Sequence, residues 1–312
     1  MKFLNTTVLA VLLGVLASGC SLYDQEDGGG TQVISAPVEG GSGAGRSPVV
    51  NTGPPPRNRT VYVPRVSGNT QVSISRASVS GPYVAMTFDD GPHPSNTPKL
   101  LDLLKARNIK ATFYVVGTNA KRYPQLLRRM VAEGHEIGNH TVNHLGLARI
   151  SNEKVRSELG QAHRAILDAC GVPPTTVRPP YGSVTKAQKQ WIFDEFGYTT
   201  VLWSVDPKDW QRPGSSVVAR RLVEGARNGS ILLAHDIHSP TITAMPSALD
   251  QLLRKGFQFV TVSQLMALQQ SAATGPQPIS LNEMPKDVGP PHELAMPGPE
   301  DGVAAIGAVK VP

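Results

Sequence analysis

Short apolar runs alternate with amphipathic segments through the middle of the chain, from about residue 81 to residue 271. Each run is rich in β-branched residues, and in chain order the runs are VAMTFDD, ATFYVVG, HEIGNHT, TTVRPPYG, TTVLWSVD, SILLAHD and FQFVTV. Such runs are typical of buried strands, and the segments between them repeat apolar residues at helical spacing. The sequence therefore predicts seven strands that alternate with seven helices.

The predicted helices begin at Pro98 and continue, in order, over about residues 120–133, 152–169, 185–196, 216–227, 244–255 and 263–270. Thr97 is expected to cap the first helix, with Pro98 in its first turn. Glycines follow four of the helix ends, where the left-handed conformation would stop the helix: Gly134, Gly171, Gly197 and Gly256.

A chain of this kind forms a parallel sheet, which either closes as a barrel or stays open with helices on both faces. Residues with reactive side chains follow the strand ends: Asp89 and Asp90, His140, Arg178 to Tyr181, Asp206 to Trp210, and His235. The mouth of a barrel would gather them around one cavity. Since about 190 residues are few for eight complete units, we predict an α/β fold, an incomplete or distorted (β/α) barrel of seven to eight units with parallel strands.

The two ends of the chain differ from the middle in composition. In residues 1–19, Lys2 precedes a short apolar core, and the following LASGC resembles a bacterial lipobox, which would direct cleavage before Cys20 and lipidation of its thiol. An ordinary secretory signal is the alternative. The composition predicts a Gly/Pro/Ser-rich tether over residues 20–80, with room for a short strand or two within 61–79. It also predicts a disordered Pro/Gly/Ala-rich tail over residues 272–312. The domain is expected over residues 81–271.

Composition limits the expected partners. Hydrophobic residues make up 40% of the 312 residues, which suits one soluble domain with appendages. The formal charge is +6, but basic runs interleaved with aromatic residues are missing from the sequence, which argues against nucleic acid as a partner. No protein partner is evident. A lipid anchor would place the protein at a membrane of the cell envelope, on its periplasmic or outer surface.

The sequence also predicts a metal site. TFDDG places Asp89 and Asp90 side by side, and adjacent carboxylates repel unless a cation lies close. In HTVNH, His140 and His144 are four residues apart, so a helical turn would put both imidazoles on one side. Two histidines and one carboxylate are the minimum set for a catalytic zinc with an open position for water. Spacing alone allows either aspartate to bind the cation and the other to act as a base.

Five motifs occur in a fixed order at the predicted strand ends: TFDDG, HTVNH, RPPYG, DPKDW and LLAHD. Over about residues 83–268 the chain therefore resembles the NodB-homology polysaccharide deacetylases, which form carbohydrate esterase family four. The resemblance implies a metal-dependent hydrolase that removes acetyl groups from N-acetylglucosamine units of an N-acetylated polysaccharide. Peptidoglycan is the expected substrate, chitin oligosaccharide comes second, and acetylated xylan stays open.

The resemblance also implies a role for each matching residue. The ligands of a divalent metal, Zn²⁺ first and Co²⁺ or another ion second, would be Asp90, His140 and His144. The catalytic pairs would be Asp89 as base beside Arg178, and His235 as acid beside Asp209. Substrate would be contacted by Tyr181, whose backbone N–H would face the oxyanion, and by Pro180, Trp210 and Leu233.

Two other classes of function remain open from the residues alone. Two histidines and a carboxylate also suit iron(II) in a mononuclear oxygenase. A non-catalytic glycan-binding lipoprotein could keep the cleft as a lectin-like groove. The additional Asp89 and His235 favour hydrolysis over both, because they supply the base and the acid that the reaction needs. His93 and His238 are further candidates for substrate contact at the predicted mouth.

Overall fold

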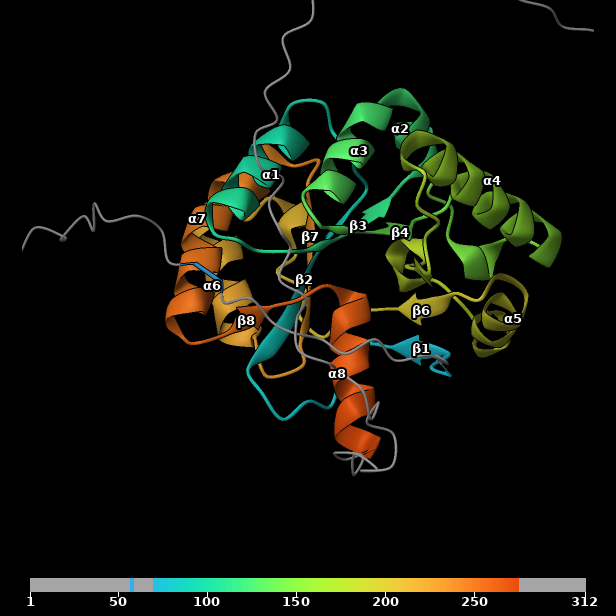
Figure 1. Ribbon diagram of the computed structural model, residues 1–312. Coiled ribbons are helices and arrows are strands. Elements are labelled where there is room, and N and C mark those ends of the chain that lie inside the picture. The colour runs from blue at the N-terminus through green and yellow to red at the C-terminus, as the bar shows by residue number, and fades with distance from the viewer. Residues whose placement is uncertain (1–56, 59–69, 275–312) are drawn as a thin grey trace, which may run out of the picture. The chain divides into compact units, whose positions relative to one another are not determined.

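The structure is a computed structural model that describes residues 57–58 and 70–274. The predicted signal peptide, Cys20, most of the tether and the tail from residue 275 lie outside these residues. The seven predicted strands are present as β2 to β8, and one short strand precedes them (Figure 1). Their bounds are β1 Ser73–Ile74, β2 Tyr83–Asp89, β3 Thr112–Val115, β4 Glu136–Asn139, β5 Thr176–Val177, β6 Thr199–Val201, β7 Ile231–His235 and β8 Gln258–Phe259.

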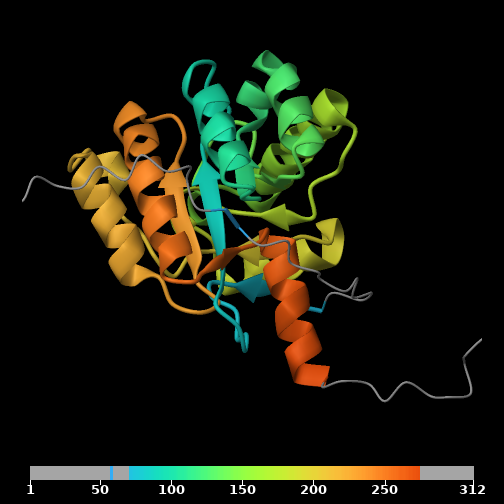
Figure 2. The same cartoon turned by 60° about the vertical axis from the view of Figure 1, so that its left-hand side comes forward.

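Helices lie around the outside of the strands, as Figures 1 and 2 show from two directions. Their bounds are α1 Asn96–Ala106, α2 Gly117–Arg122, α3 Pro124–Ala132, α4 Asn152–Cys170, α5 Lys186–Phe196, α6 Ser215–Gly225, α7 Ser239–Arg254 and α8 Val262–Thr274. Short 3-10 turns occur at Leu147–Arg149, Pro180–Gly182 and Asp209–Gln211. Within the described ranges, no helix combines the length and the apolar character needed to cross a bilayer.

All strand pairs are parallel, in the order β1-β6-β5-β4-β3-β2-β7, and β8 pairs with β2. The path of strands is open, because β7 and β1 share no ladder. A single parallel bridge between Val205 and Leu232 nevertheless connects β7 to the segment that follows β6. The fold is therefore the predicted α/β fold, an incomplete barrel of parallel strands.

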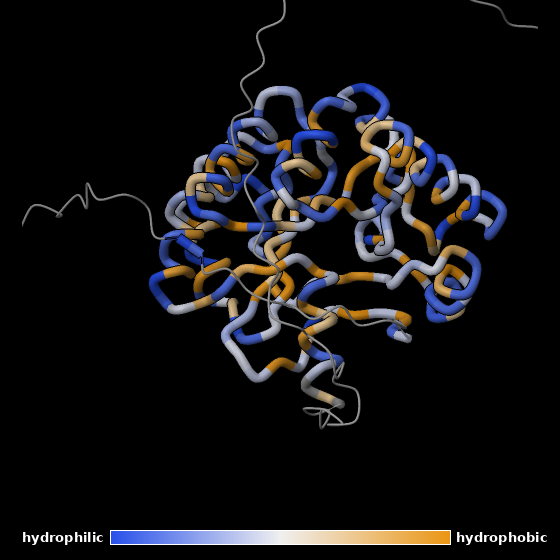
Figure 3. The backbone as a smooth tube through the Cα atoms, viewed as in Figure 1, coloured by the Kyte–Doolittle hydropathy of each residue, from blue (hydrophilic) through white to orange (hydrophobic). Residues whose placement is uncertain are grey.

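The pleat of β2 explains how the side chain of Asp89 reaches the site. Successive side chains of a strand point to opposite faces. Val84, Met86 and Phe88 belong to the large buried cluster that also contains apolar residues of α1, α3, α4, α6 and α7. The intervening Thr87 and Asp89 face the other side, where both contact Arg178. Figure 3 shows that hydrophobic residues gather in the strands and hydrophilic residues on the outward parts of the helices.

Several predicted helix boundaries require correction. The helix predicted over residues 120–133 is two helices, because Pro124 opens α3 and Tyr123 before it leaves the helical conformation at φ −131° and ψ 53°. Thr97 is not a cap: the N-cap residue is Ser95, and the Thr97 hydroxyl instead donates a hydrogen bond to buried Asp236. The predicted glycine stops are confirmed by positive φ angles at Gly134, Gly171, Gly197 and Gly256.

The ordered part of the chain extends beyond residues 81–271 at both ends. β1 lies within the segment predicted as a tether, and Ile74 and Ala77 are buried in a second apolar cluster with residues of β2, β6, β7 and α8. At the other end, α8 continues to Thr274. The short strand that the sequence allowed within 61–79 is thus present as β1, and apolar residues close to it are part of the core.

Candidate active site

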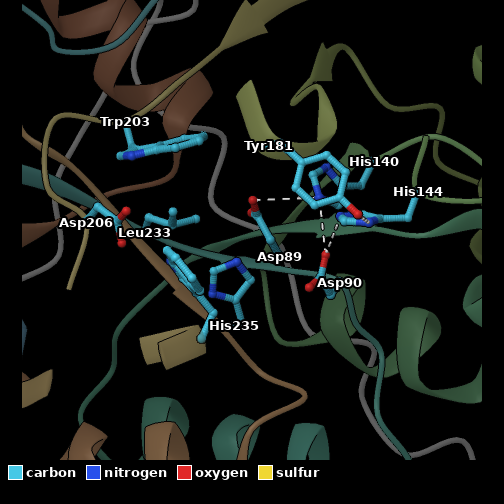
Figure 4. A pocket seen from close by; sticks show the side chains of 10 residues that line it. Asp89, Asp90, His140, His144, Tyr181, Trp203, Asp206, Leu233 and His235 are labelled. Atoms are coloured by element: carbon cyan, nitrogen blue, oxygen red, sulfur yellow. Dashed lines mark hydrogen bonds and ion pairs between the residues drawn. The ribbon is translucent and has the colours of Figure 1, made fainter. Parts of the chain in front are cut away.

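The carboxyl ends of the strands open into a cavity of about 460 Å³. Its walls are formed by Asp89, Asp90, His140, His144, Tyr181, Trp203, Asp206, Trp210, Leu233 and His235. Figure 4 shows Asp89 between two groups, one formed by Asp90, His140, His144 and Tyr181, the other by Trp203, Asp206, Leu233 and His235. The structure therefore brings the end residues of β2, β4 and β7 to one place, as the barrel prediction requires.

Asp90, His140 and His144 form a cluster whose ligand atoms lie within 4.8 Å of one another. Asp90 Oδ1 is 3.3 Å from His140 Nε2 and 3.0 Å from His144 Nε2. This oxygen is buried and accepts no hydrogen bond from the described residues. Burial raises the pKa of Asp90, but the two neighbouring imidazoles outweigh it and hold that pKa well below its usual range. Two nitrogens and one oxygen converging in this way fit a divalent cation.

The two histidines do not lie on a helical turn, contrary to the expectation from their spacing. Residues 140–146 form a loop after β4, in which Thr141 and His144 have positive φ angles of 65° and 57°. The loop, rather than a helix, turns both imidazoles toward Asp90.

The outward-facing nitrogen of each imidazole has a partner of its own. His140 Nδ1 donates a hydrogen bond to the backbone carbonyl of Arg178 at 2.6 Å. His144 Nδ1 lies 3.1 Å from the hydroxyl of Tyr181. Such contacts fix the ring orientation and leave Nε2 of both rings free for a metal. Because a carbonyl oxygen only accepts, the contact with Arg178 favours the His140 tautomer that carries its proton on Nδ1, as a metal ligand bound through Nε2 requires.

Asp89 has different surroundings from Asp90. Its Oδ1 accepts a hydrogen bond from Arg178 Nη1 at 2.8 Å, and its Oδ2 is 3.8 Å from His140 Nε2. Arg178 is completely buried and is held by the carbonyls of Val201 and Leu202. A buried guanidinium that donates a hydrogen bond to a carboxylate holds that carboxylate in a fixed orientation. The geometry thus separates the two aspartates: Asp90 faces the imidazoles, and Asp89 is tied to a fixed cation.

His235 and Asp209 form the second charged pair. His235 Nδ1 and Asp209 Oδ1 are 2.8 Å apart, and Asp209 Oδ2 accepts hydrogen bonds from the His235 backbone N–H and the Thr241 hydroxyl. Burial alone would lower the pKa of His235. The bond to Asp209, its negative charge and those of Asp89 and Asp90 outweigh burial and raise this pKa to about 9. His235 is therefore a protonated imidazolium at neutral pH, with Nε2 facing the cavity side.

The backbone around the cavity holds several residues in a conformation that side chains disfavour. The positive-φ residues other than glycine near the site are Asp90, Thr141, His144, Tyr181, Lys208 and Arg212. Each such residue costs energy that the surrounding structure must supply, and such residues cluster at functional sites. Tyr181, at φ 60°, is one of them, and among the described residues its backbone N–H has no acceptor. This N–H is free to bind a ligand.

Aromatic side chains form the outer part of the cavity. Tyr181 is 75% exposed and Trp210 is 52% exposed, while Leu233 is buried at the base. Pro180, at the start of its 3-10 turn, is buried and does not line the cavity. His238 lies with its ring 6.0 Å from that of His235, and His93 accepts hydrogen bonds from the backbone of Ser95 and Asn96. Neither of these two histidines lines the cavity.

Two residues of the walls were not given a role from the sequence. Trp203 follows β6, and its ring lies 5.8 Å from the Arg178 guanidinium. Asp206 accepts a hydrogen bond from the backbone N–H of Lys208 at 2.7 Å and so shapes the turn before Asp209. Their signal in the sequence is their place in WSVDPKDW, directly after a predicted strand end.

Comparison with known proteins shows the family to which the chain belongs. Residues 76–201 match the family model described as polysaccharide deacetylase. The chain is 40% identical over 182 residues to the peptidoglycan-N-acetylglucosamine deacetylase PgdA of Listeria monocytogenes, which covers 58% of this chain but only 38% of that protein. It is 39% identical to a chitooligosaccharide deacetylase of a Bradyrhizobium strain, over 58% of this chain and 90% of that one.

Solved structures show the same relationship. The crystal structure of a peptidoglycan N-acetylglucosamine deacetylase in complex with 4-naphthalen-1-yl-N-oxidanyl-benzamide aligns with a TM-score of 0.60 and 32% identity. The alignment covers 62% of this chain and 92% of that chain. The chain belongs to the polysaccharide deacetylase family. Because it spans well under half of the Listeria relative, its own activity and substrate are treated below as proposals.

Proposed function

We propose that this chain hydrolyses the acetamide of N-acetylglucosamine units in a polysaccharide, with peptidoglycan as the first substrate. The observation that carries the proposal is the presence, around one cavity, of Asp89 tied to Arg178 and of His235 tied to Asp209, on either side of the three-ligand cluster. A base, an acid and a cation site are what amide hydrolysis needs.

Asp90, His140 and His144 would hold the cation, and Zn²⁺ is the ion we propose, since two imidazole nitrogens and a carboxylate oxygen suit it. Co²⁺ is expected to substitute. When bound, such a cation lowers the pKa of water and polarises a carbonyl group. The chain's own residues then carry the proton transfers.

Asp89 would take a proton from the attacking water, and the hydrogen bond from Arg178 would hold this carboxylate in position. The free backbone N–H of Tyr181 would donate to the oxygen that gains negative charge as the carbonyl carbon becomes tetrahedral. His235 would donate its proton to the departing amine nitrogen, and Asp209 would hold the imidazolium in place.

The substrate proposal is supported by the relatives and by the open, aromatic walls of the cavity. Two of the relatives described above carry peptidoglycan N-acetylglucosamine in their names, and one carries chitooligosaccharide. Exposed aromatic rings such as Tyr181 and Trp210 offer apolar faces against which sugar rings can stack.

Acetate release from a panel of polymers tests this proposal. Zinc-loaded enzyme would be given peptidoglycan, chitin oligosaccharides and acetylated xylan, and product mass would locate the lost acetyl group. We expect the highest kcat/KM on peptidoglycan or its fragments, chitin oligosaccharides second. If no polymer released acetate, the proposed activity would be refuted, and a non-catalytic glycan-binding role would be favoured instead.

We also propose that Cys20 carries a lipid that anchors the protein in the cell envelope, with residues 21 to about 70 as the tether. The support is the LASGC sequence after an apolar core. Cys20→Ser is expected to leave an unprocessed precursor and to move the protein out of the membrane fraction, because two acyl chains bind a bilayer far more strongly than surface charge does. Fractionation with immunodetection would measure this, and unchanged partitioning would contradict it.

A further inference from the structure

A second cavity lies beside the metal-ligand cluster, and the mechanism above does not use it. It has a volume of about 370 Å³ and shares Asp90 and His144 with the first cavity. Its other walls come from the segments after β3, β4 and β7: Val116, Thr118, Asn119, Asn143 and Ile237. A ligand group in the first cavity that reaches the cluster is therefore adjacent to whatever occupies the second.

Asn143 is held in one orientation by a buried carboxylate. Its backbone N–H donates to Glu158 Oε2 at 2.9 Å, and its side-chain Nδ2 donates to Glu158 Oε1 at 3.0 Å. Glu158 is completely buried and also contacts Lys154 Nζ at 3.3 Å. Because a carboxylate can only accept, the amide nitrogen of Asn143 must face Glu158. Its Oδ1 accepts no hydrogen bond within residues 57–58 and 70–274 and is left for a ligand.

Asn119 is oriented by the same logic. Its Nδ2 donates to the backbone carbonyl of Asp90 at 2.8 Å, and a carbonyl also can only accept. The Oδ1 of Asn119 likewise accepts nothing from the described part of the chain. The exposed hydroxyl of Thr118 adds a group that can donate or accept, and Val116 and Ile237 add apolar surface.

Two fixed acceptors and an apolar surface define the chemistry of the occupant. It must supply hydrogen-bond donors, because the side-chain oxygens of Asn143 and Asn119 can only accept. Sugar hydroxyls and the N–H of an acetamido group meet this requirement, and sugar ring faces suit the apolar side chains. Acceptors that are already oriented bind such donors without the cost of ordering them.

We propose that the second cavity binds the sugar unit next to the one that is deacetylated, with Asn143 and Asn119 accepting its hydroxyl or acetamido hydrogens. The inference rests on the proposed function and extends it. A glycan chain would then cross the Asp90, His140 and His144 cluster rather than end there, and the enzyme would favour oligomers over single units.

The test compares a long substrate with one that reaches only the cluster. For each variant, kcat/KM is measured on a pentamer of N-acetylglucosamine and on p-nitrophenyl acetate, and the ratio of the two is taken. Asn143→Ala and Thr118→Val are expected to lower this ratio about three- to tenfold, the scale of one lost hydrogen bond. The matched control is Asn152→Ala, an exposed asparagine at the start of α4 away from both cavities, whose ratio should equal that of the wild type.

Two further measurements make the outcomes separable. Metal content of each variant shows whether Asn143→Ala has disturbed the neighbouring His144, and Thr118→Val avoids that loop altogether. Pentamer hydrolysis by the wild type with ratios unchanged in both variants would overturn the second-cavity inference alone. A fully loaded wild type that hydrolyses no glycan would overturn the proposed function itself.

Discussion

The adjacent carboxylates of Asp89 and Asp90 have different surroundings, and we therefore expect them to have different roles in the site. Asp89 contacts Arg178, which is 89 positions away in the sequence, whereas Asp90 faces His140 and His144. The sequence predicts the pair and the histidines, since all lie in short motifs at strand ends. It cannot decide between the aspartates from spacing, because the distinction depends on the positive φ of Asp90 and on contacts that only the folded chain makes.

Metal content separates the roles of the two aspartates. Asp89→Asn should keep near-normal zinc but lose at least ~10²-fold in turnover, because an amide cannot take the proton of water. Asp90→Asn should bind less zinc, since it removes one of three ligands. Atomic absorption on both purified proteins, with acetate release beside it, measures the difference. The opposite pattern of zinc content would require the two roles to be exchanged.

The protonation of His235 leads to a prediction on pH. Its pKa is raised to about 9 by its contact with Asp209, whereas His135, which is buried without such a bond, has a pKa lowered to about 3. A raised pKa keeps the acid form below that value and loses it above, so activity should fall as pH rises through about 9. A bound cation would move this fall to somewhat lower pH by repelling the imidazolium.

Asp209→Asn removes the charge that sustains the imidazolium. Burial then dominates, and the alkaline limb of the kcat profile should move down by at least ~1 pH unit. The control is Asp168→Asn, which removes an exposed carboxylate of α4 that does not line the cavity. An alkaline limb in the same place for Asp209→Asn and wild type would show that His235 is not the group that titrates.

The elements of the fold differ in how far the sequence predicts them. β2 and β7 are long and buried, and their predicted ends match the structure closely because apolar runs identify such strands well. β5 has only two residues, so its run TTVRPPYG is mostly loop. HTVNH is a loop as well, since the residues needed to turn both imidazoles inward adopt left-handed backbone angles that helical spacing does not reveal.

The segment before β2 is attached to the barrel at Gly229, which yields a prediction at the scale of elements. Ala77 N–H donates to the Gly229 carbonyl, and a Cβ added to Gly229 would lie 1.8 Å from the Ala77 carbonyl oxygen. Gly229→Ala should therefore cost at least ~2 kcal/mol of unfolding free energy, from left-handed backbone and overlap together.

Gly171→Ala provides the matched comparison for that substitution. Gly171 has nearly the same φ of 75°, but a Cβ there would meet nothing within 4 Å. Its cost should be limited to the backbone preference, about 1 kcal/mol. Thermal unfolding followed by circular dichroism compares the two, and equal losses in both variants would argue against the attachment of residues 73–77 to the start of β7.

For the molecule as a whole, the class of fold was predictable and its closure was not. Alternating strands and helices require a parallel sheet, and reactive residues after several strand ends favour a barrel. How far the sheet closes depends on two isolated bridges, Arg76 to Ser230 and Val205 to Leu232, between segments that no local pattern relates. The second cavity could not be predicted from the sequence for the same reason, since its walls come from three separate segments of the chain.

The central claim is that a cation held by Asp90, His140 and His144 is needed for deacetylation in this cavity. The most direct measurement is acetate release from peptidoglycan by enzyme stripped with a chelator, then titrated with Zn²⁺. We expect no turnover in the stripped enzyme and full recovery of turnover at one equivalent of zinc. The His140→Ala variant should not recover turnover at that zinc level. Full activity in verified metal-free protein would contradict the account.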